Sequence, residues 1–316
     1  MKRLFKWLGS LSNNKLSINI IKEDLLKTLF KNEEVLSTST SLSLGNQLEY
    51  TNEQISEALG LLIEDAKIST NNGTYQLQDS GTQDALQLIR RHRLYEKYLA
   101  EKTGFSKVNW HRKAEEMEHH LSNDEVEKMA KELGNPRFDP HGDPIPTREG
   151  ILPKLKGIPL SDVKHNAIVK ILHIEDEPRA VYKELITKGI HIGSIMAVNL
   201  TTSVYSTEGH GHHFSKDEMK NITVLVIEET EDIPKGVVRL TTLKLGEKAV
   251  ITGLSQECRG ANRRRLLDLG FVKGSKIKIN MISPLSDPKA FLIRETLIAL
   301  RKEQTDMILI KKIDAE

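Results

Sequence analysis

The stretch RKAEEMEHHLSNDE, residues 112–125, decides how the sequence is interpreted. It has the polar composition of a surface helix, yet it places Glu115, Glu118 and His119 at relative positions i, i+3 and i+4. An α-helix completes a turn in about 3.6 residues, so these three side chains project from one face. His111 precedes them by one turn on the same side. The spacing indicates a helix face that could bind a divalent cation.

A second helical stretch, RRHRLYEKYL at residues 90–99, places His92 and Glu96 at i and i+4. Two such helices packed face to face would bring carboxylates and imidazoles together. Oxygen and imidazole ligands without a thiolate favour Mn²⁺ or Fe²⁺, although Zn²⁺ would also be accepted. The residues alone leave a second interpretation open, because Glu, His and Lys at helical spacing also form ordinary solvated surfaces.

Prolines divide the chain into two regions of different periodicity. Five of the ten prolines lie in residues 140–159, which we interpret as a linker because each proline removes a backbone donor and disfavours helix before it. Upstream, apolar residues recur at helical spacing, and Asn-Asn-Gly at 71–73 predicts a small hairpin. Downstream, short β-rich runs predict small barrels. The predicted fold class is a multidomain α+β protein.

The downstream region contains an apparent duplication. Both copies have the order of a Leu-rich entry, a strand, a short helix, a Gly-(Ile/Phe)-x-x-Gly-Ser turn and another strand. We predict one barrel at residues 160–230, which is the more divergent copy, and a second at residues 236–316.

Composition excludes several classes of protein. The chain has 316 residues, with 46 Lys and Arg against 44 Asp and Glu, so no overall basic excess indicates a nucleic-acid partner. Cys258 is the only cysteine, which excludes a disulfide framework within the chain and fits a cytoplasmic protein. Polar residues interrupt the N-terminal stretch, so we expect no membrane span. No Gly-rich phosphate loop or nucleophile elbow is present, and we expect no enzymatic activity.

Three motifs together resemble a known family. RRHRLYEKYL, AEEMEHHLSNDEVEKMAKELGNP and DPHGDPIP, spread over about residues 79–146, are similar to the dimerisation and metal-sensing domain of the DtxR/MntR family of metal-dependent transcriptional repressors. The resemblance implies a winged helix-turn-helix at residues 18–80 and a helical metal-binding and dimerisation domain at 81–139. It also implies a homodimer that binds double-stranded operator DNA, with Mn²⁺ or Fe²⁺ as co-repressor.

The resemblance assigns ligands residue by residue. The implied metal ligands are Asp24, His92, Glu115, Glu118 and His119, with Glu96 and His111 in a second, ancillary site. Glu115 favours manganese, since iron-sensing members tend to carry Cys there. Lys27 departs from the pattern, because manganese sensors carry a carboxylate at that position.

The resemblance also implies a recognition helix at residues 50–66 and a wing at 68–77. We take Asn52, Gln54, Ser56 and Lys67 as candidate DNA contacts. However, residues 32–66 contain no Lys or Arg and seven carboxylates, which oppose contact with phosphates. The alternative is therefore a metal-responsive protein-interaction module that no longer binds DNA and is linked to ferrous iron transport.

The last copy, with RRRLLDLGFVKGSKIKI at residues 263–279, resembles the FeoA domain, and the preceding copy keeps its framework. In that preceding copy, His210, His212 and His213 lie in a Gly-containing loop. Such closely spaced imidazoles can capture a transition metal, but a solvated loop explains them equally.

Overall fold

The computed structural model describes residues 13–103, 105, 107–207, 210–227, 236–255 and 258–313. The chain divides into two compact units. The first contains the described residues up to 96 with segments 111–137 and 144–153, and the second contains segments 97–110 and 138–143 and the described residues from 154 onward. Helices dominate the first unit and antiparallel sheets the second, so the α+β class is confirmed.

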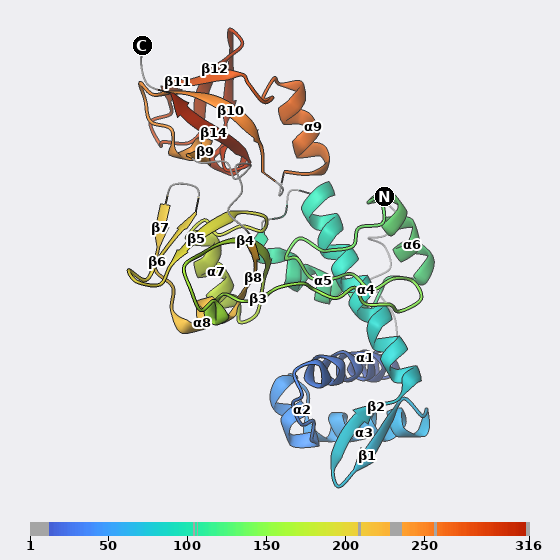
Figure 1. Cartoon of the computed structure of the whole chain (residues 1–316). Coiled ribbons are helices and arrows are strands. Elements are labelled where there is room, and N and C mark those ends of the chain that lie inside the picture. Colours follow the sequence, from blue (N-terminus) through green and yellow to red (C-terminus); the bar gives the residue numbers. More distant parts are fainter. Residues whose placement is uncertain are drawn as a thin grey trace. The chain divides into compact units, whose positions relative to one another are not determined.

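The first unit consists of helices and one hairpin (Figure 1). Its elements are α1 (Asn13–Glu34), α2 (Ser41–Gln47), α3 (Asn52–Glu64), β1 (Ile68–Asn71), β2 (Thr74–Leu77), α4 (Asp79–Lys102, as far as residue 96), α5 (Trp110–Glu118, from residue 111) and α6 (Asn123–Glu132).

Two threonines start the short helices of this unit. Thr40 and Thr51 each accept a hydrogen bond from the backbone N–H three residues later, and the side chains of Ser43 and Gln54 accept one in return. These capping boxes satisfy donors that the first helical turn leaves unpaired. Apolar side chains of α1, α2 and α3 then form a common core that contains Ile21, Leu25, Leu29, Leu44, Ile55, Leu59 and Leu62.

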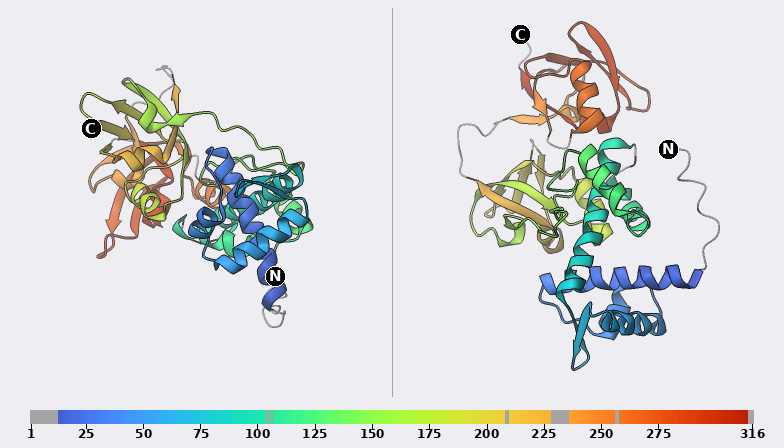
Figure 2. Two further views of the ribbon diagram at one scale, coloured as in Figure 1. Left: turned by 90° about the horizontal axis from the view of Figure 1, so that it is seen from below. Right: turned by 90° about the vertical axis from the view of Figure 1, so that its right-hand side faces the viewer.

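The hairpin of β1 and β2 has the predicted Asn-Asn-Gly turn. Asn71 pairs with Thr74, and the two residues between them, Asn72 and Gly73, have φ angles of 49° and 77°. This left-handed conformation suits Asn and Gly and matches the twist of a two-residue hairpin. The turn end of the hairpin projects beyond α3 in Figure 1 and in the right-hand view of Figure 2. Three helices followed by a hairpin are the element order expected of a winged helix-turn-helix, and that assignment remains a prediction.

The second unit contains two six-stranded antiparallel sheets. The elements of the first sheet region are β3 (Ile158–Pro159), β4 (Ala167–Ile174), α7 (Arg179–Thr187), β5 (Ile195–Asn199), β6 (Val204–Thr207), β7 (His210–His212), α8 (Lys216–Lys220) and β8 (Ile222–Ile227). Those of the second are β9 (Val237–Arg239), β10 (Lys248–Leu254), α9 (Gly260–Asp268), β11 (Lys276–Ile282), β12 (Lys289–Ile293), β13 (Thr296–Leu300), α10 (Lys302–Thr305) and β14 (Ile308–Ile313).

The two sheets have the same topology, as the internal duplication requires. The strand orders are β3-β8-β4-β5-β6-β7 and β9-β14-β10-β11-β12-β13, which are identical when each strand is matched to its counterpart in chain order. Each sheet region has its own buried apolar cluster, centred on Val169, Ile171 and Leu185 in the first and on Ile251, Phe271 and Phe291 in the second.

The repeated Gly-x-x-x-Gly-Ser turn explains why both copies keep two glycines. Gly189 and Gly193 have φ angles of 76° and 85°, and their counterparts Gly270 and Gly274 have 91° and 88°. Residues other than glycine adopt this left-handed region only at a cost, so the turn between helix and strand selects glycine.

The proline-rich segment is divided between the two units, with residues 144–153 in the first and its remaining residues in the second. Within the first unit, Arg90 donates to the carbonyl oxygen of Pro146 at 2.8 Å, and Arg93 donates to that of Pro144 at 2.6 Å. Within the second unit, the backbone N–H of Ile174 donates to the carbonyl oxygen of His141. The predicted domain boundaries at 18–80, 81–139, 140–159, 160–230 and 236–316 remain predictions.

Candidate metal centre

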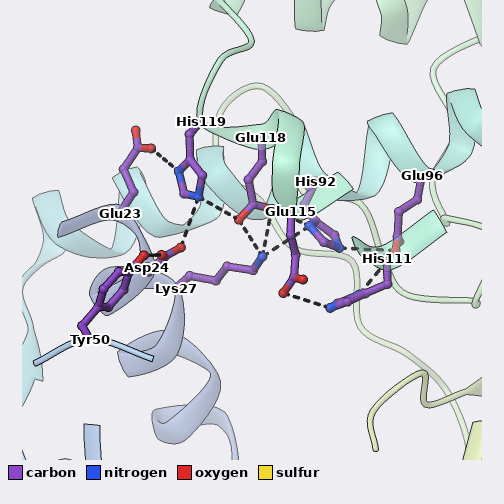
Figure 3. Close-up of polar contacts among 10 residues, drawn as sticks. All are labelled: Glu23, Asp24, Lys27, Tyr50, His92, Glu96, His111, Glu115, Glu118 and His119. Carbon is purple, nitrogen blue, oxygen red and sulfur yellow. Dashed lines mark hydrogen bonds and ion pairs between the residues drawn. The ribbon is translucent and has the colours of Figure 1, made fainter. Parts of the chain in front are cut away.

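Polar side chains from three helices of the first unit meet beside α1 (Figure 3). They are Glu23, Asp24 and Lys27 on α1, His92 and Glu96 on α4, His111, Glu115 and Glu118 on α5, and His119 directly after α5. Buried leucines hold α1 and α4 in place, among them Leu25, Leu29 and Leu94. On each helix the polar residues are next to these buried apolar positions. Their side chains therefore face the neighbouring helices.

The first cluster joins α1 to the end of α5. Asp24, Glu118 and His119 offer ligand atoms that lie within 4.8 Å of one another. His119 Nε2 lies 3.2 Å from Asp24 Oδ1 and 3.7 Å from Glu118 Oε1. Glu118 is 1% exposed, so its carboxylate is buried beside the other two side chains.

A second cluster lies between α4 and α5. His92 Nε2 and His111 Nδ1 lie 3.3 and 3.5 Å from the same oxygen, Oε1 of Glu96, and the two rings meet edge to face. The other ring nitrogen of His92, Nδ1, contacts Glu118 Oε2. His92 therefore touches both clusters.

Glu115 lies in a different environment from Glu118 on the same helix. Its side chain is half exposed, and Oε1 lies 3.2 Å from His111 Nε2. The hydrogen bond with His111 lowers the pKa of Glu115 below its usual value. Within the first unit, the structure thus places Glu115 beside His111, whereas Asp24, Glu118 and His119 form the neighbouring group.

Opposing effects set the charge of the first cluster. Burial would raise the pKa of Glu118, but the charges of Lys27 and His92 and their hydrogen bonds outweigh it and lower that pKa to about 2. Burial would lower the pKa of His119, but hydrogen bonds with Asp24 and Glu23 outweigh it and raise that pKa to about 9. Without a metal ion, the carboxylate is therefore ionised and the imidazole is protonated at neutral pH.

Three residues of the centre were not predicted as ligands or ligand partners. Lys27 Nζ lies 2.8 and 2.9 Å from the two carboxylate oxygens of Glu118. Glu23 Oε2 lies 2.6 Å from His119 Nδ1, and the Tyr50 hydroxyl donates to Asp24 Oδ2 at 2.5 Å. Burial and the bond to Asp24 raise the pKa of Tyr50. Glu23 could have been predicted because it is adjacent to Asp24 in the sequence, whereas no local sequence pattern indicates Tyr50.

The donor set fits a divalent transition metal. Each cluster combines carboxylate oxygen with imidazole nitrogen and contains no thiolate, which suits Mn²⁺ or Fe²⁺. Neighbouring groups already orient the ligands, since Tyr50 bonds to Asp24 and Glu23 bonds to His119, and such supporting bonds are typical of metal sites. Lys27 is the exception, because it brings a positive charge to Glu118.

The candidate DNA contacts differ in their availability. Asn52 and Ser56 are exposed on α3. Gln54 accepts a hydrogen bond from the backbone N–H of Thr51, and Lys67 forms an ion pair with Asp84 at 2.8 Å. Two of the four candidates are therefore already engaged within the chain.

The histidine loop does not form a three-ligand group among the residues that the structure describes. His210 is exposed at the start of β7, His212 Nε2 lies 2.7 Å from Thr207 Oγ1, and His213 Nδ1 lies 3.0 Å from the carbonyl oxygen of Ser203.

Across the same described residues, no helix is both long and apolar enough to cross a membrane.

Comparisons with known proteins identify two domains. Residues 78–147 match the family described as iron dependent repressor, metal binding and dimerisation domain, and residues 238–312 match the FeoA domain. These matches confirm the resemblance to the DtxR/MntR repressors and to FeoA that the sequence motifs indicate.

Individual relatives cover parts of the chain. A probable metal transport system membrane protein of Chlamydia trachomatis is 38% identical over 88 residues, which are 28% of this chain and 20% of that protein. The iron-dependent repressor IdeR of Mycobacterium leprae is 29% identical over 125 residues, which are 39% of this chain and 54% of the repressor. The chain thus spans about one fifth of the length of the transport protein and about half of the length of the repressor IdeR. A manganese-dependent transcriptional repressor in complex with manganese superposes with a TM-score of 0.58 at 25% identity, over 65% of this chain and 99% of that structure.

Proposed function

We propose that this chain, which carries the metal-binding and dimerisation domain of iron-dependent repressors and a FeoA domain, is a metal-dependent transcriptional regulator. In this account it acts in the cytoplasm as a homodimer, binds operator DNA when loaded with Mn²⁺ or Fe²⁺, and represses genes of metal uptake. Its two C-terminal sheet regions would each close as a FeoA-like barrel.

One observation carries the proposal. Asp24 on α1 lies 3.2 Å from His119 Nε2, and Glu118 is beside both, although these ligands are more than ninety positions apart in the sequence. α1 belongs to the winged-helix part of the first unit, and α5 follows the long helix α4. An ion bound here would therefore join the helices proposed to contact DNA to the helices of the matched metal-binding and dimerisation domain.

The chain's own residues would convert metal binding into a change of conformation. A bound ion would supply a positive charge that attracts the ligands of both helices at once. Tyr50 holds Asp24 by a hydrogen bond, so movement of Asp24 is coupled to the segment that leads into α3 through the N-cap residue Thr51. The ion can shift the balance between two arrangements of α1 only by the difference in its affinity for them.

A gel-shift titration tests this function. Purified full-length protein would be mixed with fragments of its source genome at low salt, with and without Mn²⁺ or Fe²⁺. The proposal predicts retardation of specific fragments only when metal is present. Absence of metal-dependent retardation for every fragment would contradict DNA-binding regulation.

The second candidate is a metal-responsive protein-interaction module that is linked to ferrous iron transport and no longer binds DNA. The acidic surface of α3 favours it, since Glu53, Glu57 and Glu64 are exposed there and would face the phosphates of DNA. The matched FeoA domain also fits this candidate. It predicts metal binding without any retardation in the same titration.

A further inference from the structure

The buried carboxylate of the first cluster is already in contact with a positive charge of the chain. Lys27 Nζ donates to both oxygens of Glu118, at 2.8 and 2.9 Å, and lies 3.3 Å from His92 Nδ1. The two side chains are 12% and 1% exposed. Figure 3 shows the ammonium group reaching from α1 to the place where Glu118 and His92 approach each other.

We infer that the Lys27 ammonium group competes with a divalent metal ion for Glu118. A metal ion then enters the Asp24–Glu118–His119 cluster only by displacing this ammonium group. The inference rests on the proposed function only in that this cluster is taken to bind metal.

The competition follows from the geometry of the carboxylate. The ammonium group contacts both Glu118 oxygens, while His92 contacts one of them from another side. A divalent ion that coordinates Glu118 would lie within a few ångströms of the ammonium charge, in a site from which most water is excluded. Like charges at such a separation repel strongly when the effective dielectric constant is low.

Displacement is physically feasible for a lysine. Its ammonium group is a point charge on a flexible four-carbon stem, so it can leave Glu118 without movement of the α1 backbone. Binding is then an exchange of one cation for another, and the affinity for the ion is reduced by the free energy of the Lys27–Glu118 contact. The same contact keeps α1 joined to α5 in the metal-free protein.

A charge-removing substitution tests the competition. Lys27→Met keeps the length of the side chain and removes its charge, and Lys31→Met removes an exposed charge one turn later on the same helix. Full-length proteins would be titrated with Mn²⁺ by calorimetry, and the ions retained per chain would be counted by elemental analysis after desalting.

We expect Lys27→Met to bind Mn²⁺ about tenfold more tightly or better than the unsubstituted protein and to keep more of its Mn²⁺ through desalting. Lys31→Met should behave like the unsubstituted protein. Adding Asp24→Asn to Lys27→Met should remove the gain, which assigns it to this cluster. Lys27→Gln provides a second neutral variant if Lys27→Met does not fold, and Lys27→Arg should keep the original affinity.

The outcomes separate this inference from the proposed function. If the unsubstituted protein and the neutral variants bind Mn²⁺ equally, Lys27 does not compete and the inference is wrong, while the metal-sensing function stands. If only the neutral variants bind Mn²⁺, the inference is correct and metal sensing by the natural chain is wrong. If none of them binds Mn²⁺, both are wrong.

Discussion

Lys27 on α1 and Glu118 on α5 form a buried ion pair across 91 positions of the sequence, with both carboxylate oxygens of Glu118 accepting from one ammonium group. The pair links α1 to α5 within the first unit. It also lies between the Asp24–Glu118–His119 cluster and His92 of the second cluster. The contact between Lys27 and Glu118 therefore influences both the stability of the metal-free protein and its affinity for metal.

Removal of Lys27 should destabilise the metal-free protein. Lys27→Met leaves the Glu118 carboxylate buried without its ammonium partner, and loss of one member of a buried pair costs about 3 kcal/mol or more. Hydrogen exchange of the amides of residues 21–29 should become faster in metal-free Lys27→Met than in metal-free Lys31→Met. Equal exchange in the two variants would show that the pair does not hold α1.

The stability of the metal-free protein should fall as pH rises from 6.5 toward 9. Folding raises the pKa of His119 from 6.5 to about 9, so the folded state binds a proton that the unfolded state releases in this range. The stabilisation is complete below pH 6.5 and is lost as pH passes through 9. Thermal unfolding in the presence of a chelator measures this dependence, and His119→Gln should weaken it. A flat profile from pH 6.5 to 9 in the unsubstituted protein would contradict the raised pKa.

Mn²⁺ affinity should depend on pH through the same imidazole. A metal ion coordinates the neutral ring, so the proton of His119 must leave first, and affinity should increase close to tenfold per pH unit well below the pKa of about 9. Calorimetric titrations at several pH values, repeated in buffers of different ionisation enthalpy, would count the protons released. Binding without proton release at pH 7 would indicate that His119 is not a ligand.

Loss of the His119 imidazole should weaken metal binding and leave the fold intact. His119→Ala removes one of three donors of the first cluster, and we expect Mn²⁺ affinity to fall by roughly a hundredfold. His120→Ala is the matched control, because it removes the adjacent but exposed imidazole. If the chain forms the proposed homodimer, its metal-dependent ordering, followed by small-angle scattering, should disappear only in His119→Ala. Unchanged Mn²⁺ affinity in that variant would remove His119 from the site.

The acidic surface of α3 offers a test of DNA binding. Glu53 and Glu57 are exposed on α3, and carboxylates there oppose contact with phosphates. The double substitution Glu53→Gln and Glu57→Gln should raise DNA affinity roughly tenfold at low salt if α3 enters a groove. Fluorescence anisotropy with a retarded fragment measures the change. If neither protein binds DNA, the interaction-module function is favoured.

Local patterns predicted much of the fold. Helical spacing on α4 and α5, the Asn-Asn-Gly hairpin and the two copies of the Gly-x-x-x-Gly-Ser turn all depend on residues close in the sequence, and the structure contains each of them. The identical strand orders of the two sheets agree with the duplication. Closure of either sheet as a barrel remains a prediction.

The centre was predictable only where its spacing is local. The i, i+3, i+4 pattern of Glu115, Glu118 and His119 indicated one helix face, whereas the structure places Glu115 beside His111 and the other two beside Asp24. The resemblance indicated Asp24 and marked Lys27 as a departure. The contacts of Lys27 with Glu118, and of Tyr50 with Asp24, depend on how α1 packs against distant elements, which no periodicity reveals.

The most direct test of the account is an anomalous diffraction map of crystals of the full-length protein grown with Mn²⁺. Metal binding at the first cluster predicts a manganese peak coordinated by Asp24 of α1 together with Glu118 and His119, with the Lys27 ammonium group moved away from Glu118. A map without a peak among these three residues, or with Lys27 still bound to Glu118 beside the ion, would contradict it.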